Sequence, residues 1–141
     1  MTEQWINDYL GRPWRADAEG PEAYDCKGLV RAVQRRVWCR EVPALLHVGM
    51  TTDWAEVRAS CVHSGWRPIA EGDAAQPGDV LLVRGSSGPH VGVFVRLDGR
   101  TLVLHAHGLV RGGVQVGRVR LNNLCDLLAG GYSRPQIWRC A

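Results

Sequence analysis

The sequence predicts an α+β fold, with helices in the first half of the chain and a meandering, mainly antiparallel sheet in the second half. Up to about residue 64, apolar residues recur at helical spacing. From residue 76 onward, short apolar runs alternate with turn sequences such as Asp98-Gly99 and Gly112-Gly113. With 141 residues, of which 45% are hydrophobic, the chain is long enough to bury its own core. We therefore expect a single domain over residues 1–141.

Three segments of the first half are predicted to be helices. Residues 3–10 form a short amphipathic helix that a Gly/Pro-rich loop follows. Asp25 is a good N-cap residue for a helix over about 25–38, because its carboxylate can accept the free N–H groups of the first turn. A third helix over about 51–64 begins at a threonine cap and has a glutamate placed as in a capping box.

The second half is predicted to contain five strands and one short helix. The expected strands cover residues 80–84, 90–97, 101–107, 114–121 and 134–140. The short helix begins at Asn122 or Asn123 and ends at Gly130-Gly131.

Composition excludes several classes of protein. The net charge of +3 is mild and the arginines are scattered, so we expect no nucleic-acid partner. No stretch approaches the ~20 apolar residues of a membrane span. The N-terminus lacks the features of a signal peptide, so we expect synthesis in a cytoplasm and no membrane span.

The five cysteines form no C-x-x-C pair. Their irregular spacing argues against a disulfide framework or a zinc site, and we expect neither metal nor cofactor. Four of them, Cys39, Cys61, Cys125 and Cys140, are interpreted as small buried hydrophobic residues.

Cys26 differs from the other cysteines because it follows the N-cap residue of the predicted 25–38 helix. A thiol there experiences the positive end of the helix dipole, which favours the nucleophilic thiolate. The same N-terminus can donate N–H groups to an oxyanion. A catalytic cysteine also requires a base.

Hairpin register supplies candidates for that base. If Asp98-Gly99 is a two-residue loop, Leu97 pairs with Arg100. Continuing outward, the pairs that share one face are Gly92 with His105 and His90 with His107. A cysteine at a helix N-terminus with a histidine cluster on a sheet is typical of Cys/His nucleophilic enzymes. The alternative is three ordinary histidines and a buried cysteine.

At these residues the chain resembles the NlpC family of papain-like cysteine peptidases. The matching segments are Asp25-Cys26-Lys27-Gly28-Leu29-Val30, Gln76-Pro77-Gly78-Asp79-Val80, His90-Val91-Gly92-Val93-Phe94 and Leu104-His105-Ala106. The resemblance implies the papain-like NlpC fold, with N-terminal helices packed on a mainly antiparallel sheet. Family members commonly hydrolyse amide bonds in peptidoglycan stem peptides, and the resemblance implies the same substrate here.

The resemblance also assigns roles to individual residues. It implies that Cys26 is the nucleophile, His90 the general base and His105 the residue that orients it. His107 remains an alternative orienting residue, because the expected register pairs it with His90. The substrate-binding residues that the resemblance implies are Asp25, Tyr24 and Lys27. Lys27 stands where wall-lysing members usually have serine, which leaves the specificity open.

Within the family, the chain looks similar to the stand-alone members of phage tails. The similarity lies in Gly11-Arg12-Pro13-Trp14-Arg15 and in Gly131-Tyr132-Ser133-Arg134-Pro135. It implies synthesis in a host cytoplasm, a place in the virion tail and tail-tip or hub proteins as partners. A structural tail-tip component with a vestigial or specialised site is the alternative. An acyltransferase or toxin-like effector on the same fold is a third.

Overall fold

The computed structural model describes residues 3–42, 59, 62, 64–70, 72–86 and 88–140. The elements in chain order are η1 (Glu3–Asp8), α1 (Cys26–Trp38), β1 (Trp66–Pro68), β2 (Val80–Gly85), β3 (Gly88–Leu97), β4 (Arg100–Arg111), β5 (Val114–Asn122), α3 (Leu124–Ala129) and β6 (Ser133–Cys140). The predicted 51–64 helix, with its threonine cap, falls largely outside the described residues.

The described strands form one six-stranded sheet in the order β1-β6-β2-β3-β4-β5. Neighbouring strands of this sheet pair antiparallel. The α+β prediction is therefore confirmed. The predicted short first helix is present as a 3₁₀ helix, η1. The sequence did not predict β1, a three-residue edge strand that pairs with β6.

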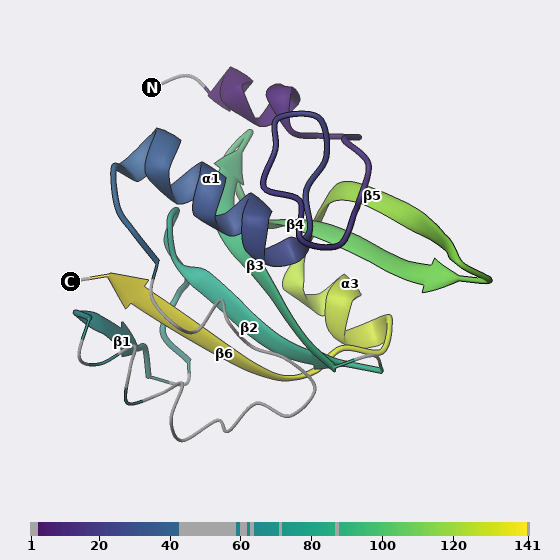
Figure 1. Cartoon of the computed structure of the whole chain (residues 1–141). Helices are drawn as coiled ribbons and strands as arrows, with labels where there is room; N and C mark the ends of the chain where they lie inside the picture. The colour runs from purple at the N-terminus through teal and green to yellow at the C-terminus, as the bar shows by residue number, and fades with distance from the viewer. Residues whose placement is uncertain are drawn as a thin grey trace.

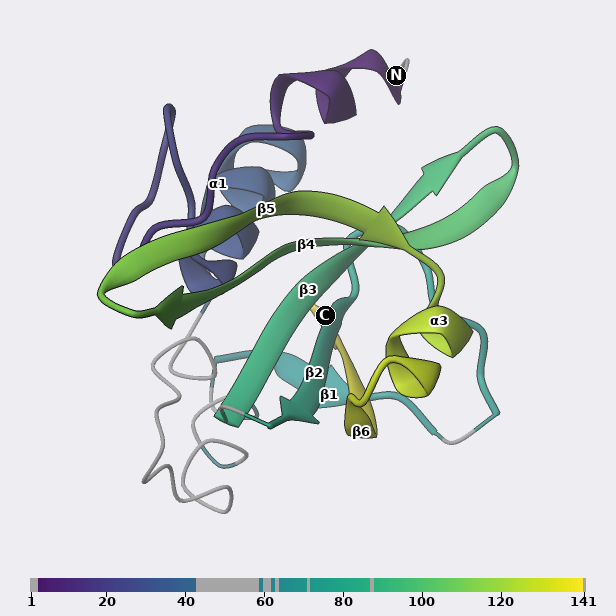
Figure 2. The same cartoon turned by 90° about the vertical axis from the view of Figure 1, so that its right-hand side faces the viewer.

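The centre of the sheet is buried on both faces, which explains why β2 reads as a continuous apolar run. Val80 and Leu82 belong to the core on the α1 side. Leu81 and Val83 belong to a second core, together with Leu127 of α3. Figures 1 and 2 show α1 and α3 on opposite sides of the central strands. The alternating side chains of β2 thus pack against a different helix on each face.

Helix α1 begins where the sequence predicted. Asp25 is its N-cap, and the Asp25 carboxylate accepts a hydrogen bond from the Gly28 N–H at 2.6 Å. Leu29, Val30 and Val33 are fully buried and pack on β3 and β4. The cap and this apolar stripe together fix the first turn of α1 against the sheet.

The turn before β2 is held by a partly buried ion pair. The Asp79 carboxylate is almost fully buried and accepts hydrogen bonds from Arg139 Nε and Nη2 of β6 at 3.0 and 2.8 Å. It also accepts from the Gln76 backbone N–H at 2.8 Å. The Gln34 side chain of α1 donates to the Gly78 carbonyl at 2.8 Å. The Gln76-Pro77-Gly78-Asp79 segment therefore joins α1, β2 and β6.

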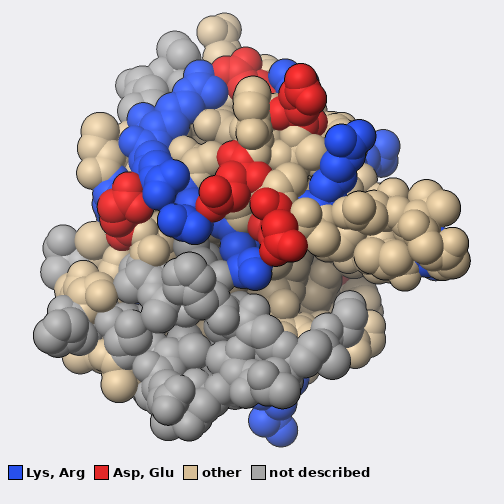
Figure 3. All heavy atoms as spheres, in the orientation of Figure 1, with Lys and Arg blue, Asp and Glu red and all other residues tan. Residues whose placement is uncertain are grey.

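Charged side chains of both signs are interspersed over the face that carries α1 (Figure 3). Three exposed ion pairs lie there: Arg31 with Glu19, Arg35 with Glu41, and Arg36 with Asp8. Such pairs contribute little to stability. Among the residues that the structure describes, none of the helices combines the length and the hydropathy of a transmembrane span.

Cysteine burial differs from the sequence-based expectation. Cys39 is exposed, because it is the left-handed C-cap residue of α1. Cys125, in the first turn of α3, is also exposed, and Cys140 is only partly buried. The interpretation of these cysteines as buried was therefore wrong for Cys39 and Cys125, while Cys61 lies outside the described residues.

Candidate active site

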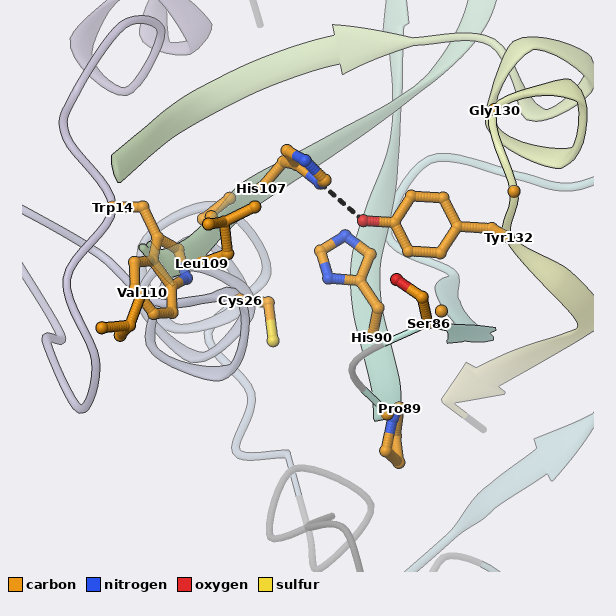
Figure 4. A pocket seen from close by; sticks show the side chains of 15 residues that line it. Trp14, Cys26, Ser86, Pro89, His90, His107, Leu109, Val110, Gly130 and Tyr132 are labelled. Atoms are coloured by element: carbon orange, nitrogen blue, oxygen red, sulfur yellow. Dashed lines mark hydrogen bonds between the residues drawn. The ribbon is translucent and has the colours of Figure 1, made fainter. Parts of the chain in front are cut away.

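A pocket of about 620 Å³ opens where β3 and β4 separate. The β3–β4 ladder runs from Leu97↔Arg100, as predicted, only to Val93↔Leu104. Beyond that pair β4 continues with β5 alone. Figure 4 shows this pocket. Its lining residues are Trp14, Cys26, Gly85, Ser86, Gly88, Pro89, His90, Ala106, His107, Gly108, Leu109, Val110, Gly130, Gly131 and Tyr132.

Cys26 is the first residue of α1 and is partly buried at this pocket. Burial raises the pKa of its thiol, and the negative charge of Asp25 raises it further. Backbone hydrogen bonds from Val91 and Lys27 and the positive charge of Lys27 lower the pKa, but they do not overcome burial. The sequence-based expectation of a stabilised thiolate was therefore wrong, since the helix terminus is present but desolvation dominates. The raised pKa keeps Cys26 in the thiol form at neutral pH.

His90 and His105 form the central contact of the site. His90 Nε2 lies 2.9 Å from His105 Nδ1, and both side chains are buried. Gly92 permits the approach of the two strands, because a Cβ there would lie 2.6 Å from Val103 Cγ1 and 3.2 Å from His105 Cβ. The expected direct pairing of His90 with His107 is absent, because the β3–β4 ladder ends before it. The structure thus places His105, not His107, in hydrogen-bond contact with His90.

Asn122, the last residue of β5, completes this line of hydrogen bonds. His105 Nε2 lies 2.8 Å from Asn122 Oδ1. An amide oxygen only accepts, so His105 Nε2 bears the proton and His105 Nδ1 is the acceptor. His90 Nε2–H must then donate to His105, which leaves the lone pair of His90 on Nδ1. The relay therefore leaves His90 as the tautomer that can act as a base.

Both imidazoles are neutral at neutral pH. Burial lowers the pKa of His90 to about 3, helped by His105 and His107. Burial also lowers the pKa of His105 to about 4, against the opposing effect of the Asn122 hydrogen bond. The site at rest is consequently a thiol with neutral imidazoles, which suits general-base catalysis.

Sequence reasoning missed Asn122 as a site residue and considered it only as a helix cap. Register arithmetic could have found it. Counting outward from the Gly112-Gly113 turn pairs Val103 with Asn122, as observed, on the sheet face of His105. Tyr132 was missed too, and no spacing signal in the sequence points to it. Its hydroxyl lies 2.6 Å from His107 Nδ1, and its ring stacks on that of His90.

Trp14 forms a wall of the pocket and also packs against the α1-side core. Its indole ring covers Gly108 of β4, and a Cβ at Gly108 would collide with that ring. Glycine at 108 is therefore what lets the loop before α1 close over the strand. With Leu109 and Val110, Trp14 makes this side of the pocket apolar.

The three implied substrate-binding residues lie beside the pocket rather than among its lining residues. Asp25 is buried, and its carboxylate accepts from the backbone N–H groups of Asp17 and Gly28. Tyr24 is buried and packs against Tyr9. Lys27 is partly buried, and its charge acts on Cys26. Their role in binding substrate stays a prediction.

The described residues contain no group of three or more His, Cys, Asp or Glu side chains arranged to hold a metal ion. Instead, His90 and His105 hydrogen-bond to each other, His105 also to Asn122, and His107 to Tyr132. The arrangement fits nucleophilic chemistry on a carbonyl or similar electrophile.

Comparison with known proteins supports the fold. No protein-family model matches the chain, and no curated protein matches its sequence. Two crystal structures of an N-acetylmuramoyl-L-alanine amidase from Bacteroides uniformis are similar, with TM-scores of 0.50 and 0.51 and 13% identity in each case. The alignments cover 96% of this chain and 96% and 95% of the amidase chains. The protein thus shares its α+β fold with this amidase over almost its whole length.

Proposed function

We propose that this protein is a cysteine hydrolase with the papain-like NlpC fold, and that it cuts amide bonds in peptidoglycan. The observation that supports this most directly is the relay from Asn122 through His105 to His90, which ends at the pocket that Cys26 lines. It supplies a neutral base beside a thiol, as nucleophilic catalysis requires.

The proposed reaction has two halves. His90 Nδ1 takes the thiol proton while Cys26 Sγ attacks the carbonyl carbon of the scissile amide. The carbon–nitrogen bond then breaks, and the leaving nitrogen receives the proton from His90. Water, deprotonated by His90 Nδ1, then hydrolyses the resulting thioester. The proton returns from His90 to sulfur, which restores the Cys26 thiol. His105 and Asn122 act as positioning residues, because they hold the proton on His90 Nε2.

Several features support peptidoglycan as the substrate. The motifs around Cys26, His90 and His105 resemble those of the NlpC family, whose members cut stem peptides. The two similar crystal structures are of an N-acetylmuramoyl-L-alanine amidase, a name that refers to hydrolysis of an amide bond between muramic acid and alanine. The pocket volume of about 620 Å³ is in the range that accommodates a short peptide segment.

Mass spectrometry of purified cell wall, digested by the wild type and by Cys26→Ala, tests this proposal. We expect new products from the wild type only. Release of whole stem peptides would indicate cleavage at the muramoyl bond, and shortened stems would indicate an endopeptidase. Cys39→Ala is the matched control, because Cys39 is exposed at the opposite end of α1. Identical digests from the wild type and Cys26→Ala would overturn the proposal.

We further propose a place in a phage tail tip, on the basis of the resemblance of residues 11–15 and 131–135 to tail-associated members. The β4–β5 hairpin supports a docking role there, because Val110, Val114 and Val116 are exposed near its turn. A purely structural tail-tip component is the second candidate function, and the same valines favour it. Particles with Cys26→Ala distinguish the two: normal infectivity would indicate structure, and lost infectivity would indicate catalysis.

A further inference from the structure

Tyr132 lies between His90 and His107, the two histidines that line the pocket. Its ring stacks on His90, with centroids 4.8 Å apart and planes 19° apart. Its hydroxyl oxygen lies 2.6 Å from His107 Nδ1 (Figure 4). All three side chains line the pocket that Cys26 also lines. The hydrolytic steps described above use neither Tyr132 nor His107.

The hydroxyl keeps its proton under all ordinary conditions. Burial raises the pKa of Tyr132 to about 12, and the negative charge of a Cys26 thiolate adds to the increase. Tyr132 and Cys26 line the same pocket. Burial and the charge of Arg120 lower the pKa of His107, so its imidazole is neutral at neutral pH. The pair therefore consists of a neutral phenol and a neutral imidazole.

A neutral phenol has a single proton to donate. When His107 bears its proton on Nδ1, it donates to the Tyr132 oxygen, and the phenolic proton is free to point into the pocket. We propose that the Tyr132 hydroxyl donates a hydrogen bond to the oxyanion formed when Cys26 attacks a carbonyl, and that His107 is the residue that positions it. This inference rests on the proposed function, because it requires a carbonyl substrate.

The step balances without moving the phenolic proton. Cys26 Sγ bonds to the carbonyl carbon, and the electron pair of the carbon–oxygen double bond moves onto oxygen. The thiol proton goes to His90. The new oxyanion accepts hydrogen bonds from Tyr132 and from the backbone at the start of α1, where the Lys27 N–H already points at Sγ. When the leaving group departs, the electron pair on oxygen re-forms the carbon–oxygen double bond.

Tyr132→Phe separates this role from packing, because it removes the hydroxyl and keeps the ring that stacks on His90. Two reactions of Cys26 are compared. Acylation by p-nitrophenyl acetate passes through an oxyanion, whereas alkylation by iodoacetamide displaces iodide at a saturated carbon and does not. We expect Tyr132→Phe to slow acylation about 10²-fold, as for the loss of one oxyanion donor. Alkylation should stay unchanged, and Tyr9→Phe, in the core, is the matched control.

His107 gives a second, independent comparison. We expect His107→Ala to slow acylation about tenfold, as for loss of a supporting hydrogen bond. His107→Asn should restore most of that rate, because its amide can donate to the Tyr132 oxygen. A purely structural role of His107 predicts no such rescue.

The outcomes separate this inference from the proposed function. Acylation at the wild-type rate in Tyr132→Phe overturns the inference, even if wall fragments are cut. An equal loss of acylation and alkylation also overturns it, since Tyr132 would then serve only His90. Slowed acylation alone supports it, even if the wild type cuts no wall fragment and peptidoglycan is the wrong substrate. Absence of acylation at Cys26 in the wild type overturns both.

Discussion

His105 Nε2 lies 2.8 Å from Asn122 Oδ1, and this contact sets the direction of every proton in the relay. Since an amide oxygen only accepts, the contact determines the tautomer of His105 and, through it, that of His90. If Asn122 presented its amide nitrogen instead, both hydrogen bonds of the relay would reverse direction, and His90 Nδ1 would bear a proton. A side chain that does not line the pocket thus determines whether His90 is a base.

We predict that Asn122→Ala lowers kcat about 10- to 100-fold, as is typical for loss of a residue that orients a catalytic group. Asn122→Asp should keep more activity than Asn122→Ala, because a carboxylate also accepts from His105 Nε2. The measurement is kcat on wall fragments or on an activated ester, with thermal unfolding as a check on folding. Equal kcat for wild type and Asn122→Ala would show that the relay is not used.

The thiol form of Cys26 makes a prediction about pH. Because burial raises the pKa of Cys26 and the partner imidazoles are neutral, we expect alkylation by iodoacetamide to increase steadily toward high pH. A preformed thiolate–imidazolium pair would instead react at a constant rate from about pH 6. Mass spectrometry of the Cys26 peptide follows the rate, and exposed Cys39 in the same sample serves as the reference. A plateau at acidic pH would contradict the thiol assignment.

The lowered pKa values of His90 and His105 also make folding sensitive to acid. Between their ordinary value of 6.5 and their folded values of about 3 and about 4, the unfolded chain binds protons that the folded chain does not. The contribution of these two histidines to the free energy of unfolding should therefore be fully present above pH 6.5 and decrease as the pH falls. Each histidine contributes about 1.4 kcal/mol per pH unit in this window.

Urea unfolding at a series of pH values measures this slope. The double variant His90→Gln, His105→Gln is the comparison, because carboxylate protonation affects both proteins alike. We expect a shallower decrease in the double variant between pH 6.5 and about 4. Equal slopes would show that the two histidines protonate in the folded state.

The fold was predictable where the local sequence determines the structure. The N-cap at Asp25, the Asp98-Gly99 turn and the pairing of Leu97 with Arg100 all follow from short-range chemistry. The site was predictable only in part, because the sequence does not reveal where two paired strands separate. The end of the β3–β4 ladder at Val93↔Leu104 brings His105 to His90 and leaves His107 for Tyr132.

Site features that depend on packing between distant segments could not be predicted from local sequence patterns. Tyr132 reaches the pocket from the loop between α3 and β6, and its position depends on the packing of both elements. The thiol pKa was predicted in the wrong direction because a helix terminus is visible in sequence and desolvation is not. Asn122 lies between these cases, since it follows from the second hairpin register but was considered only as a cap.

The two roles of Asp25 make different predictions. Its carboxylate oxygens accept from Gly28 N at 2.6 Å and from Asp17 N at 3.0 Å, which is a structural role. We expect Asp25→Ala to lower the free energy of unfolding by about 2 kcal/mol and Asp25→Asn by about 1 kcal/mol, because asparagine keeps one accepting oxygen.

The substrate-binding role implied by the sequence resemblance predicts instead that the charge of Asp25 recognises a peptide amine. Cleavage of stem peptides with free and acetylated amines distinguishes these roles in Asp25→Asn. With both oxygens bound to backbone N–H groups, we expect the preference for the free amine to stay as in the wild type, and its loss would show that Asp25 also binds substrate.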